Sequence, residues 1–299
     1  MKRGDIKTGD IKVGNDKNGD IKNSSIKTGI RRFYVACKKY VAIAKINFAN
    51  RLAYKVDMVS DIFFSIFIFS ILHFLYRATA GITPSSAIEK LSLAQIMWVM
   101  FLATVFSGVR HKGVSKELNK EILSGQIAYQ LNRPYSYAMF HFAQHVGTLL
   151  PTVIFSGIVS GIFLYFLVGL PPLYLGPCLL GTIMLFIGVV IIFLIQFCIG
   201  LCAFWIGNVD PLRWIYMQIM IIAGGGAVPL AFFPSFIKKI LMMLPFSNAG
   251  YGAARIIVGC PRSDLWQYFG LQIFWLFMML LITRFLFKRG IKNVVICGG

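Results

Sequence analysis

The sequence predicts an all-α integral membrane protein with six transmembrane helices. Of its 299 residues, 57% are apolar and only 14% are charged, and the mean hydropathy is +0.72. Soluble globular domains are less apolar and carry more charge. The apolar runs also have about the 20 residues that a helix needs to cross a hydrocarbon core of about 30 Å. They cover residues 58–76, 93–109, 142–169, 173–206, 212–233 and 265–287.

These runs are expected to be helices rather than barrel strands. In lipid, each backbone amide must find its hydrogen-bond partner within the protein, which leaves helices and closed barrels as the spanning structures. A barrel strand alternates polar and apolar residues, and none of the six runs does so.

The basic residues place both chain termini in the cytoplasm. Lys and Arg are retained on the cytoplasmic side during insertion. With six spans and an inner N-terminus, 24 of the 30 Lys and Arg residues fall in inner segments. The net charge of +19 is then explained by topology and by attraction to an anionic inner leaflet, so no nucleic-acid partner is expected.

Residues 1–30 form a low-complexity tail. The pentads GDIKT, GDIKV, GNDKN, GDIKN and SSIKT fill residues 4–28. A short β-solenoid is one reading, but five copies make little more than one coil, and a solenoid needs stacked neighbours to bury its core. The polar composition favours disorder.

Residues 31–56 are expected to form an amphipathic helix in the membrane interface. One face is apolar and the opposite face is basic, which suits a helix lying flat at the lipid headgroups. The alternative is a cytoplasmic extension of the first span. The apolar face comprises Phe33, Cys37, Val41, Ala44, Phe48 and Leu52, and the basic face comprises Arg31, Arg32, Lys38, Lys39 and Lys45.

Asp57 and Asp61 lie one turn apart where the six-span domain, residues 57–299, begins. Acids within a span often mark ion or proton pathways. These two are at the cytoplasmic end, where they can reach water or pair with Arg51 and Lys55. A structural role is therefore favoured over a proton relay.

The cytoplasmic segment 110–140 is predicted to contain two short helices. The first covers Val114–Leu123 and stops at Ser124-Gly125, since glycine adopts the left-handed conformation without strain. The second covers Ile127–Asn132. We expect their apolar side chains to be exposed and ringed by charges, which is typical of a surface that docks a partner. These side chains are Ile122, Ile127, Tyr129 and Leu131.

Residues 224–262 are predicted to be re-entrant or interfacial helices on the outer side, between spans five and six. Pro229, Pro234 and Pro245 interrupt the segment. Its basic residues Lys238, Lys239 and Arg255 cannot rest in hydrocarbon. Apolar helices of roughly 10 to 14 residues are too short to span.

Four short motifs follow one another along residues 31–299, and their order is more specific than any one of them. They are Ala53-Tyr54-Lys55-Val56-Asp57; Glu121-Ile122-Leu123-Ser124-Gly125-Gln126-Ile127 with Leu131-Asn132-Arg133-Pro134; Pro229-Leu230-Ala231-Phe232-Phe233-Pro234 with Leu244-Pro245-Phe246; and Lys288-Arg289-Gly290-Ile291-Lys292 with Gly298-Gly299. Together they resemble the permease subunits of type 2 ATP-binding-cassette (ABC) exporters, in the subgroup of daunorubicin and viologen exporters.

This resemblance implies a transport subunit, not an enzyme, that pairs with a like or paralogous permease and with two cytosolic ABC ATPase subunits. ATP and Mg²⁺ would bind to the ATPase, and this chain would hold no cofactor or metal. Gly108 and Gly113 have a phosphate-loop spacing, but Val114 follows instead of Lys, so no phosphate cradle is expected here. The resemblance also implies a prokaryotic cytoplasmic membrane, with lipids as further partners.

In such exporters the segment after the second span is a coupling helix seated in the ATPase, and the first, second and fifth spans line the substrate route. The cargo expected from so apolar a lining is amphipathic, drug-like, peptide or lipid-like. The coupling residues implied are Glu117, Lys120, Glu121, Ile122, Gly125, Ile127, Tyr129 and Arg133. The route residues implied are Phe63, Phe64, Phe67, Trp98, Phe101, Trp214, Tyr216 and Met217.

Other classes of protein fit less well. His141 and His145 lie one turn apart but have no acidic residue near them in the sequence to complete a metal site. The stretch Gly157-Ile158-Val159-Ser160-Gly161 weakly suggests a serine protease, yet no histidine lies in spans four to six to activate the serine as a nucleophile. A self-contained carrier or scramblase without an ATPase is the stronger alternative.

Deleting residues 1–29 should leave membrane insertion and transport nearly unchanged, because a disordered tail contributes no packing to the spans. Detergent extraction and size-exclusion chromatography of the truncated chain measure insertion and folding. Failure of the truncated chain to insert would show that the tail has a structural role.

Overall fold

The structure is a computed structural model that describes residues 35, 37–79, 91–107, 113–226, 230 and 233–297. The pentad tail of residues 1–30 lies outside the described residues. The chain divides into two units, residues 1–42 and 43–299. In the first unit, residues 37–42 are helical.

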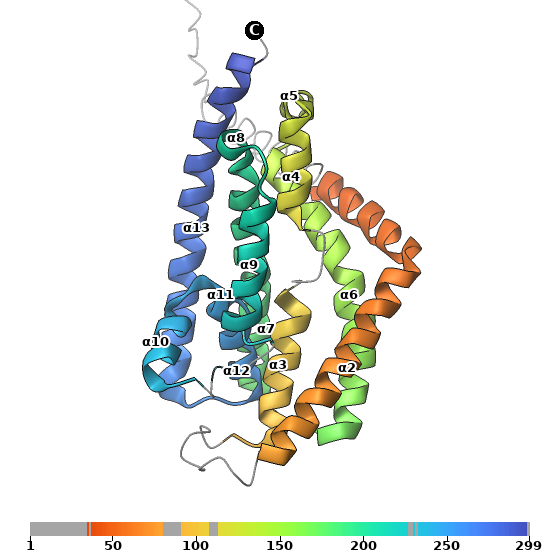
Figure 1. Ribbon diagram of the computed structural model, residues 1–299, viewed down its shortest axis with the longest axis vertical. Coiled ribbons are helices and arrows are strands. Elements are labelled where there is room, and N and C mark those ends of the chain that lie inside the picture. The colour runs from red at the N-terminus through yellow and green to blue at the C-terminus, as the bar shows by residue number, and fades with distance from the viewer. Residues whose placement is uncertain are drawn as a thin grey trace, which may run out of the picture. The chain divides into compact units, whose positions relative to one another are not determined.

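The second unit is mostly helical where it is described, with no strand among those residues. Residues 43–53 are helical and are followed by the elements shown in Figure 1. These are α2 (Lys55–Thr79), α3 (Leu93–Ser107), α4 (Val114–Leu123), α5 (Gln126–Leu131), α6 (Tyr137–Val168), α7 (Leu175–Leu201), α8 (Ala203–Ile206), α9 (Asp210–Ala223), α10 (Ser235–Met243), α11 (Pro245–Ser247), the π-helix η2 (Asn248–Gly252), α12 (Ala253–Val258) and α13 (Arg262–Cys297).

Helix α7 is the centre of the second unit. In its most apolar stretch 56% of the residues are buried, against 11% for α13. It packs against α12, α13, α4, η2 and α3. A helix that is apolar all round, as α7 is, needs protein neighbours or lipid on every side, and here most sides are covered by protein.

Helices α2, α3 and α6 share a separate apolar cluster. Phe69 of α2, Met97 and Met100 of α3, and Leu164 of α6 are almost completely buried there. Figure 1 shows α2 lying along α6, in agreement with their contacts.

Four of the described helices are long and apolar enough to cross a membrane. They are Lys55–Ala78, Tyr137–Val168, Leu175–Ile206 and Asp264–Lys292, and they contain most of the predicted runs 58–76, 142–169, 173–206 and 265–287. The observed helices extend beyond most of the predicted bounds, because polar residues continue a helix outside the apolar core.

The predicted second and fifth spans are shorter in the structure. Helix α3 has 15 residues and α9 has 14, which rise about 21–23 Å, less than a hydrocarbon core of about 30 Å. The predicted run 212–233 is not one helix, because α9 ends at Ala223 and Gly225 takes a φ of 74°. Residues 108–112, 227–229 and 231–232 lie outside the described residues.

The predicted outer segment 224–262 contains the short helices α10 to α12. Tyr251 and Ala254 are buried against Val99 of α3, whereas Phe236 and Met243 of α10 are exposed. Figure 1 shows α10 and α5 near opposite ends of α13. Whether the segment is re-entrant stays a prediction.

A close approach of backbones joins this segment to the central helix. A Cβ atom on Gly188 of α7 would collide with the carbonyl oxygen of Ala249 in η2. Backbone atoms cannot move aside as a flexible side chain can, so only glycine fits at this crossing.

Gly188→Ala should therefore destabilise the protein by about 1–3 kcal/mol, the usual cost of overpacking a core. Thermal unfolding in detergent, followed by size-exclusion chromatography, measures the effect. Gly176→Ala is the matched control in the same helix, because nothing lies within 4 Å of its added Cβ. Equal stability of the two variants would contradict the observed helix crossing.

Candidate functional site

The α4–α5 segment consists of two short helices joined by a turn. Its two helices cover Val114–Leu123 and Gln126–Leu131, within a residue of the predicted bounds. Gly125 separates them with a φ of 72°, a left-handed conformation that favours glycine. The predicted role of Gly125 as the stop of the first helix is confirmed.

Helix α4 is fixed to the central helix α7. Leu118 is fully buried, and a Cβ on Gly200 would lie 2.7 Å from the Cβ of Leu118. The backbone N–H of Val114 also donates to Oε1 of Gln196, at 3.1 Å. This bond satisfies one of the free N–H groups that every helix start leaves. The segment is therefore seated on α7 rather than loosely attached.

Glu121 joins the same segment to the start of α6. Its Oε2 accepts a 2.7 Å hydrogen bond from the hydroxyl of Tyr137 and lies 3.3 Å from Nε2 of His141. Both partners are buried. Sequence reasoning noticed His141 but not this contact; the available signal was two polar side chains one turn apart at the start of an apolar helix.

The two acids of α4 are in opposite electrostatic environments. Burial by itself raises the pKa of Glu121, but the hydrogen bonds from His141 and Tyr137 and the charge of His141 outweigh it, so the pKa lies below 4.5. For Glu117, loss of surrounding water raises the pKa above 4.5, an effect that the charge of His141 partly offsets. Glu117 remains in contact with solvent, because its side chain lines a pocket that opens to the surface.

The exposed surface of α4 and α5 is smaller than the sequence predicted. Leu123 and Tyr129 are exposed, by 60% and 65%, and the guanidinium of Arg133 lies 4.7 Å from the centre of the Tyr129 ring. The predicted exposure of Ile127 is wrong, since it is 1% exposed and packs into the cluster that contains Leu118.

The other side chains that were predicted for this surface also include half-buried and exposed ones. Ile122 and Leu131 are half-buried against that cluster, whereas Lys120 is exposed. A six-residue helix such as α5 has fewer than two turns, so its sequence alone cannot show which side faces the protein.

A polar pocket of about 510 Å³ lies beside the start of α4. Its walls come from residues 43–53 and from α2, α4, α6 and α7. Gly147 of α6 lies against Ala44 of the first wall, where an added Cβ would collide with the Ala44 carbonyl. The lining residues are Asn47, Asn50, Arg51, Tyr54, Asp57, Ser60, Asp61, Gly113, Val114, Glu117, Gln144, His145, Thr148 and Gln196.

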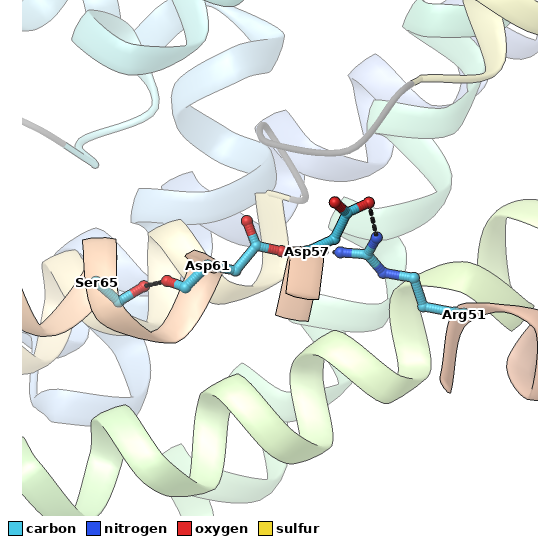
Figure 2. A network of polar contacts seen from close by, with 4 residues as sticks. All are labelled: Arg51, Asp57, Asp61 and Ser65. Atoms are coloured by element: carbon cyan, nitrogen blue, oxygen red, sulfur yellow. Dashed lines mark hydrogen bonds and ion pairs between the residues drawn. The ribbon is translucent and has the colours of Figure 1, made fainter. Parts of the chain in front are cut away.

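Arg51 forms ion pairs with Asp57 and Asp61, the two acids at the start of the predicted first span. Its guanidinium donates to Oδ2 of Asp61 at 2.8 Å and to Oδ2 of Asp57 at 3.4 Å (Figure 2). Figure 2 also shows Ser65, whose hydroxyl donates to the carbonyl oxygen of Asp61. The predicted ion pairing is confirmed, with Arg51 rather than Lys55 as the partner.

The half-buried face of residues 43–53 carries Ala44, Phe48 and Leu52, while Lys45 is exposed. Within residues 43–53 this division follows the predicted apolar and basic faces, whereas Cys37 and Val41 of the predicted apolar face are exposed. The interfacial position of the helix stays a prediction.

A sequence profile of ABC-2 family transporter proteins matches residues 62–298. The chain belongs to the ABC-2 family. It is thus a membrane component of a transporter, a class whose members generally work with ABC ATPase subunits. No curated protein matches the sequence.

The predicted substrate-route residues of this ABC-2 chain are partly exposed and partly buried. On α2, Phe63, Phe64 and Phe67 are exposed. Phe101 of α3 is buried, against Phe69 and in edge contact with Trp98.

The route residues of α9 are divided as well. Trp214 is 63% exposed, whereas Tyr216 is 5% exposed and packs with Met217 against the core of α7. The exposed aromatic residues therefore lie on two helices, and the buried ones serve packing.

The two acids of α4 should give opposite responses to pH when each is changed to glutamine. Because the pKa of Glu121 is lowered, its carboxylate stabilises the folded protein above pH 4.5. This stabilisation is lost as the pH falls through the lowered pKa. Glu121→Gln should thus cost about 1–2 kcal/mol near pH 7 and progressively less in acid.

Glu117→Gln should behave in the opposite sense. Because the pKa of Glu117 is raised, the ionised carboxylate destabilises the folded protein. This destabilisation increases as the pH rises from 4.5 through the raised pKa. The variant should be slightly more stable than wild type near pH 7, by less than about 1 kcal/mol since the side chain is exposed. Thermal unfolding in detergent across pH measures both, and parallel curves for the two variants would contradict the assigned environments.

Proposed function

We propose that the chain is the permease subunit of an ABC exporter whose ATPase is a separate polypeptide. The membership in the ABC-2 family supports the class. The observation that carries the coupling role is the α4–α5 segment, where exposed Leu123, Tyr129 and Arg133 stand on a base formed by buried Leu118 and Ile127.

This arrangement suits a surface that receives force. Aromatic residues and arginine dominate binding energy at protein interfaces, and the cation–π contact holds Arg133 over the Tyr129 ring. A push on α5 is transmitted to α4, and from α4 to α7 through Leu118 and to α6 through Glu121. ATP-driven closure of the partner then shifts a two-state equilibrium of the spans and requires no chemical step in this chain.

The proposed assembly contains two permease chains, identical or paralogous, with ATP and Mg²⁺ bound only by the two ATPase subunits. Each permease would have six spans, with α3 and α9 in the second and fifth and with α10–α12 dipping from the outer side. Both termini would be cytoplasmic, in a prokaryotic membrane. The motifs favour the subgroup of daunorubicin and viologen exporters.

The proposed cargo is an amphipathic, drug-like, peptide or lipid-like molecule. The exposed phenylalanines of α2 and Trp214 of α9 provide apolar and aromatic surface for such a molecule. A self-contained carrier or scramblase is the competing function, because a polar pocket beside an apolar helix face also suits a lipid headgroup and its tails. It differs in needing no ATPase.

A photo-crosslinking residue in place of Tyr129 should capture the ATPase. The chain is co-expressed with candidate ABC ATPases of its own organism, p-benzoylphenylalanine replaces Tyr129, and the crosslinked product is identified by mass. The matched control is Tyr174, which is 67% exposed in the α6–α7 connection and is expected on the outer side. Crosslinking from 174 but not from 129 would invert the topology and end the coupling proposal.

Replacing Tyr129 with alanine should reduce the ATPase activity or the yield of the complex by about tenfold, since a central interface aromatic contributes about 1.4 kcal/mol or more. Tyr174→Ala should have no effect. Lipid scrambling by the purified chain without any ATPase, at an unchanged rate when ATPase and ATP are added, would instead establish the competing function.

A further inference from the structure

Helix α13 carries an exposed face that the coupling role does not use. The apolar part of this face consists of four exposed side chains that recur at steps of three and four, so they share one side of the helix. They are Phe274, Phe277, Leu281 and Phe285. From the exposed Trp266 to Phe285 the helix rises about 28 Å, close to the thickness of a hydrocarbon core, about 30 Å. Only 11% of the most apolar stretch of α13 is buried, so this face is open to acyl chains.

The same face becomes basic where its apolar part ends. Arg284, Lys288 and Lys292 follow one another at steps of four, and Arg289 is next to Lys288. All four side chains are exposed, and none of them forms an ion pair with a described residue. Helix α13 holds no acidic residue beyond Asp264. This end of the helix therefore carries four positive charges and no negative one.

The rest of the chain is too basic to neutralise this surface. The sequence contains 30 Lys and Arg residues against 11 Asp and Glu residues. Asp57, Asp61 and Asp210 pair with arginines near them in the chain. The residues outside the described ranges also contain more basic than acidic side chains, so they add to the excess of positive charge. Counter-ions for the end of α13 must come from another molecule.

One of the four basic groups is held at the boundary between the apolar and the basic part of the face. The guanidinium of Arg289 lies 4.6 Å from the centre of the Phe285 ring, one turn earlier. A cation–π contact of this kind restricts the side chain. Arginine presents a planar fork of N–H donors that matches a phosphate group. Arg289 is thus positioned where acyl chains along the face would meet their phosphate.

Helix α8 marks the same level on a neighbouring element. A Cβ atom on Gly290 would collide with the ring of Phe204, so α8 packs closely on α13 at the basic end, as Figure 1 also shows. Gly290 lies about 7.5 Å along the helix beyond Phe285, the end of the apolar part. Trp205 of α8 is exposed at this level. Tryptophan is enriched where the hydrocarbon core meets the headgroups, so two elements indicate a headgroup layer here.

We propose that the basic end of α13, beside α8, binds an anionic phospholipid. Arg289 and Lys288 contact the phosphate, and the acyl chains lie along the apolar part of the face, next to Leu281 and Phe285. Lipids without net charge are bound more weakly, because clustered Lys and Arg residues at a membrane surface favour anionic headgroups. The inference rests on neither the coupling role nor the cargo, since this lipid is a neighbour of the protein and is not transported.

The test measures lipid binding to the purified, delipidated full chain by native mass spectrometry. Phosphatidylglycerol, cardiolipin and phosphatidylcholine, all with oleoyl chains, are titrated separately. We expect the dissociation constant of phosphatidylglycerol to be at least about tenfold lower than that of phosphatidylcholine, and that of cardiolipin, which has two phosphates, to be lower still. Raising the ammonium acetate concentration should reduce this difference, because salt screens exposed charges.

A double variant and a matched control assign the binding to the end of α13. Lys288→Gln combined with Arg289→Gln should weaken phosphatidylglycerol binding at least about tenfold and change phosphatidylcholine binding by less than about twofold. The control combines Lys116→Gln with Lys239→Gln, two exposed lysines of α4 and α10. It removes the same charge from outside the α13 face and should leave both affinities within about twofold.

A competition experiment separates a lipid from a soluble phosphate. Glycerophosphoglycerol has the headgroup of phosphatidylglycerol without its acyl chains. It should not displace the lipid at equal concentration, and displacement would contradict a lipid site. Equal affinities for phosphatidylglycerol and phosphatidylcholine, or the same loss in the double variant and the control, would overturn the proposal. No ATPase takes part in these measurements, so their outcome is independent of crosslinking at position 129.

Discussion

The close approach of α4 to α7 is the constraint on which this end of the helical unit depends. Gly200 has no side chain, and Leu118 fills the space that one would occupy. This contact fixes α4 beside the most buried helix of the chain. If a larger residue stood at position 200, α4 would be displaced, and both the exposed surface of α5 and the wall of the pocket would move with it.

The apolar contact is supplemented by hydrogen bonds to two different spans. Oε1 of Gln196 in α7 accepts a hydrogen bond from the backbone N–H of Val114, and the hydroxyl of Tyr137 in α6 donates one to Glu121. Such bonds are directional, whereas apolar packing is not. Together they give the short helix α4 a defined position relative to α6 and α7, which is what the proposed coupling role needs if force from an ATPase is to reach the spans.

Glu117 and Glu121 show how one helical turn separates two roles. Glu121 faces α6 and is held there by Tyr137 and His141. Glu117 faces the pocket that also contains Arg51 and its acids. The proposed coupling surface and the pocket therefore share α4, so a movement of this helix changes both. The sequence resemblance had assigned the two acids a single role.

The sequence by itself determined the class of the protein, most of its helices and the bounds of the α4–α5 segment. These follow from local properties: apolar runs of spanning length, short motifs in a fixed order, and a glycine that adopts a left-handed turn. The pairing of Asp57 and Asp61 with an arginine was also predictable, since the residues are near one another in the chain.

Only the tertiary structure decided which face of each helix is buried. Ile127 and Tyr129 are both large, both apolar enough to dock a partner and two residues apart, yet the first is buried and the second is exposed. The contacts of Glu121 with α6, and the pocket that gathers residues from positions 47 to 196, join segments that are distant in the chain. Local periodicity cannot specify such contacts, because they depend on how the helices pack and not on any one helix.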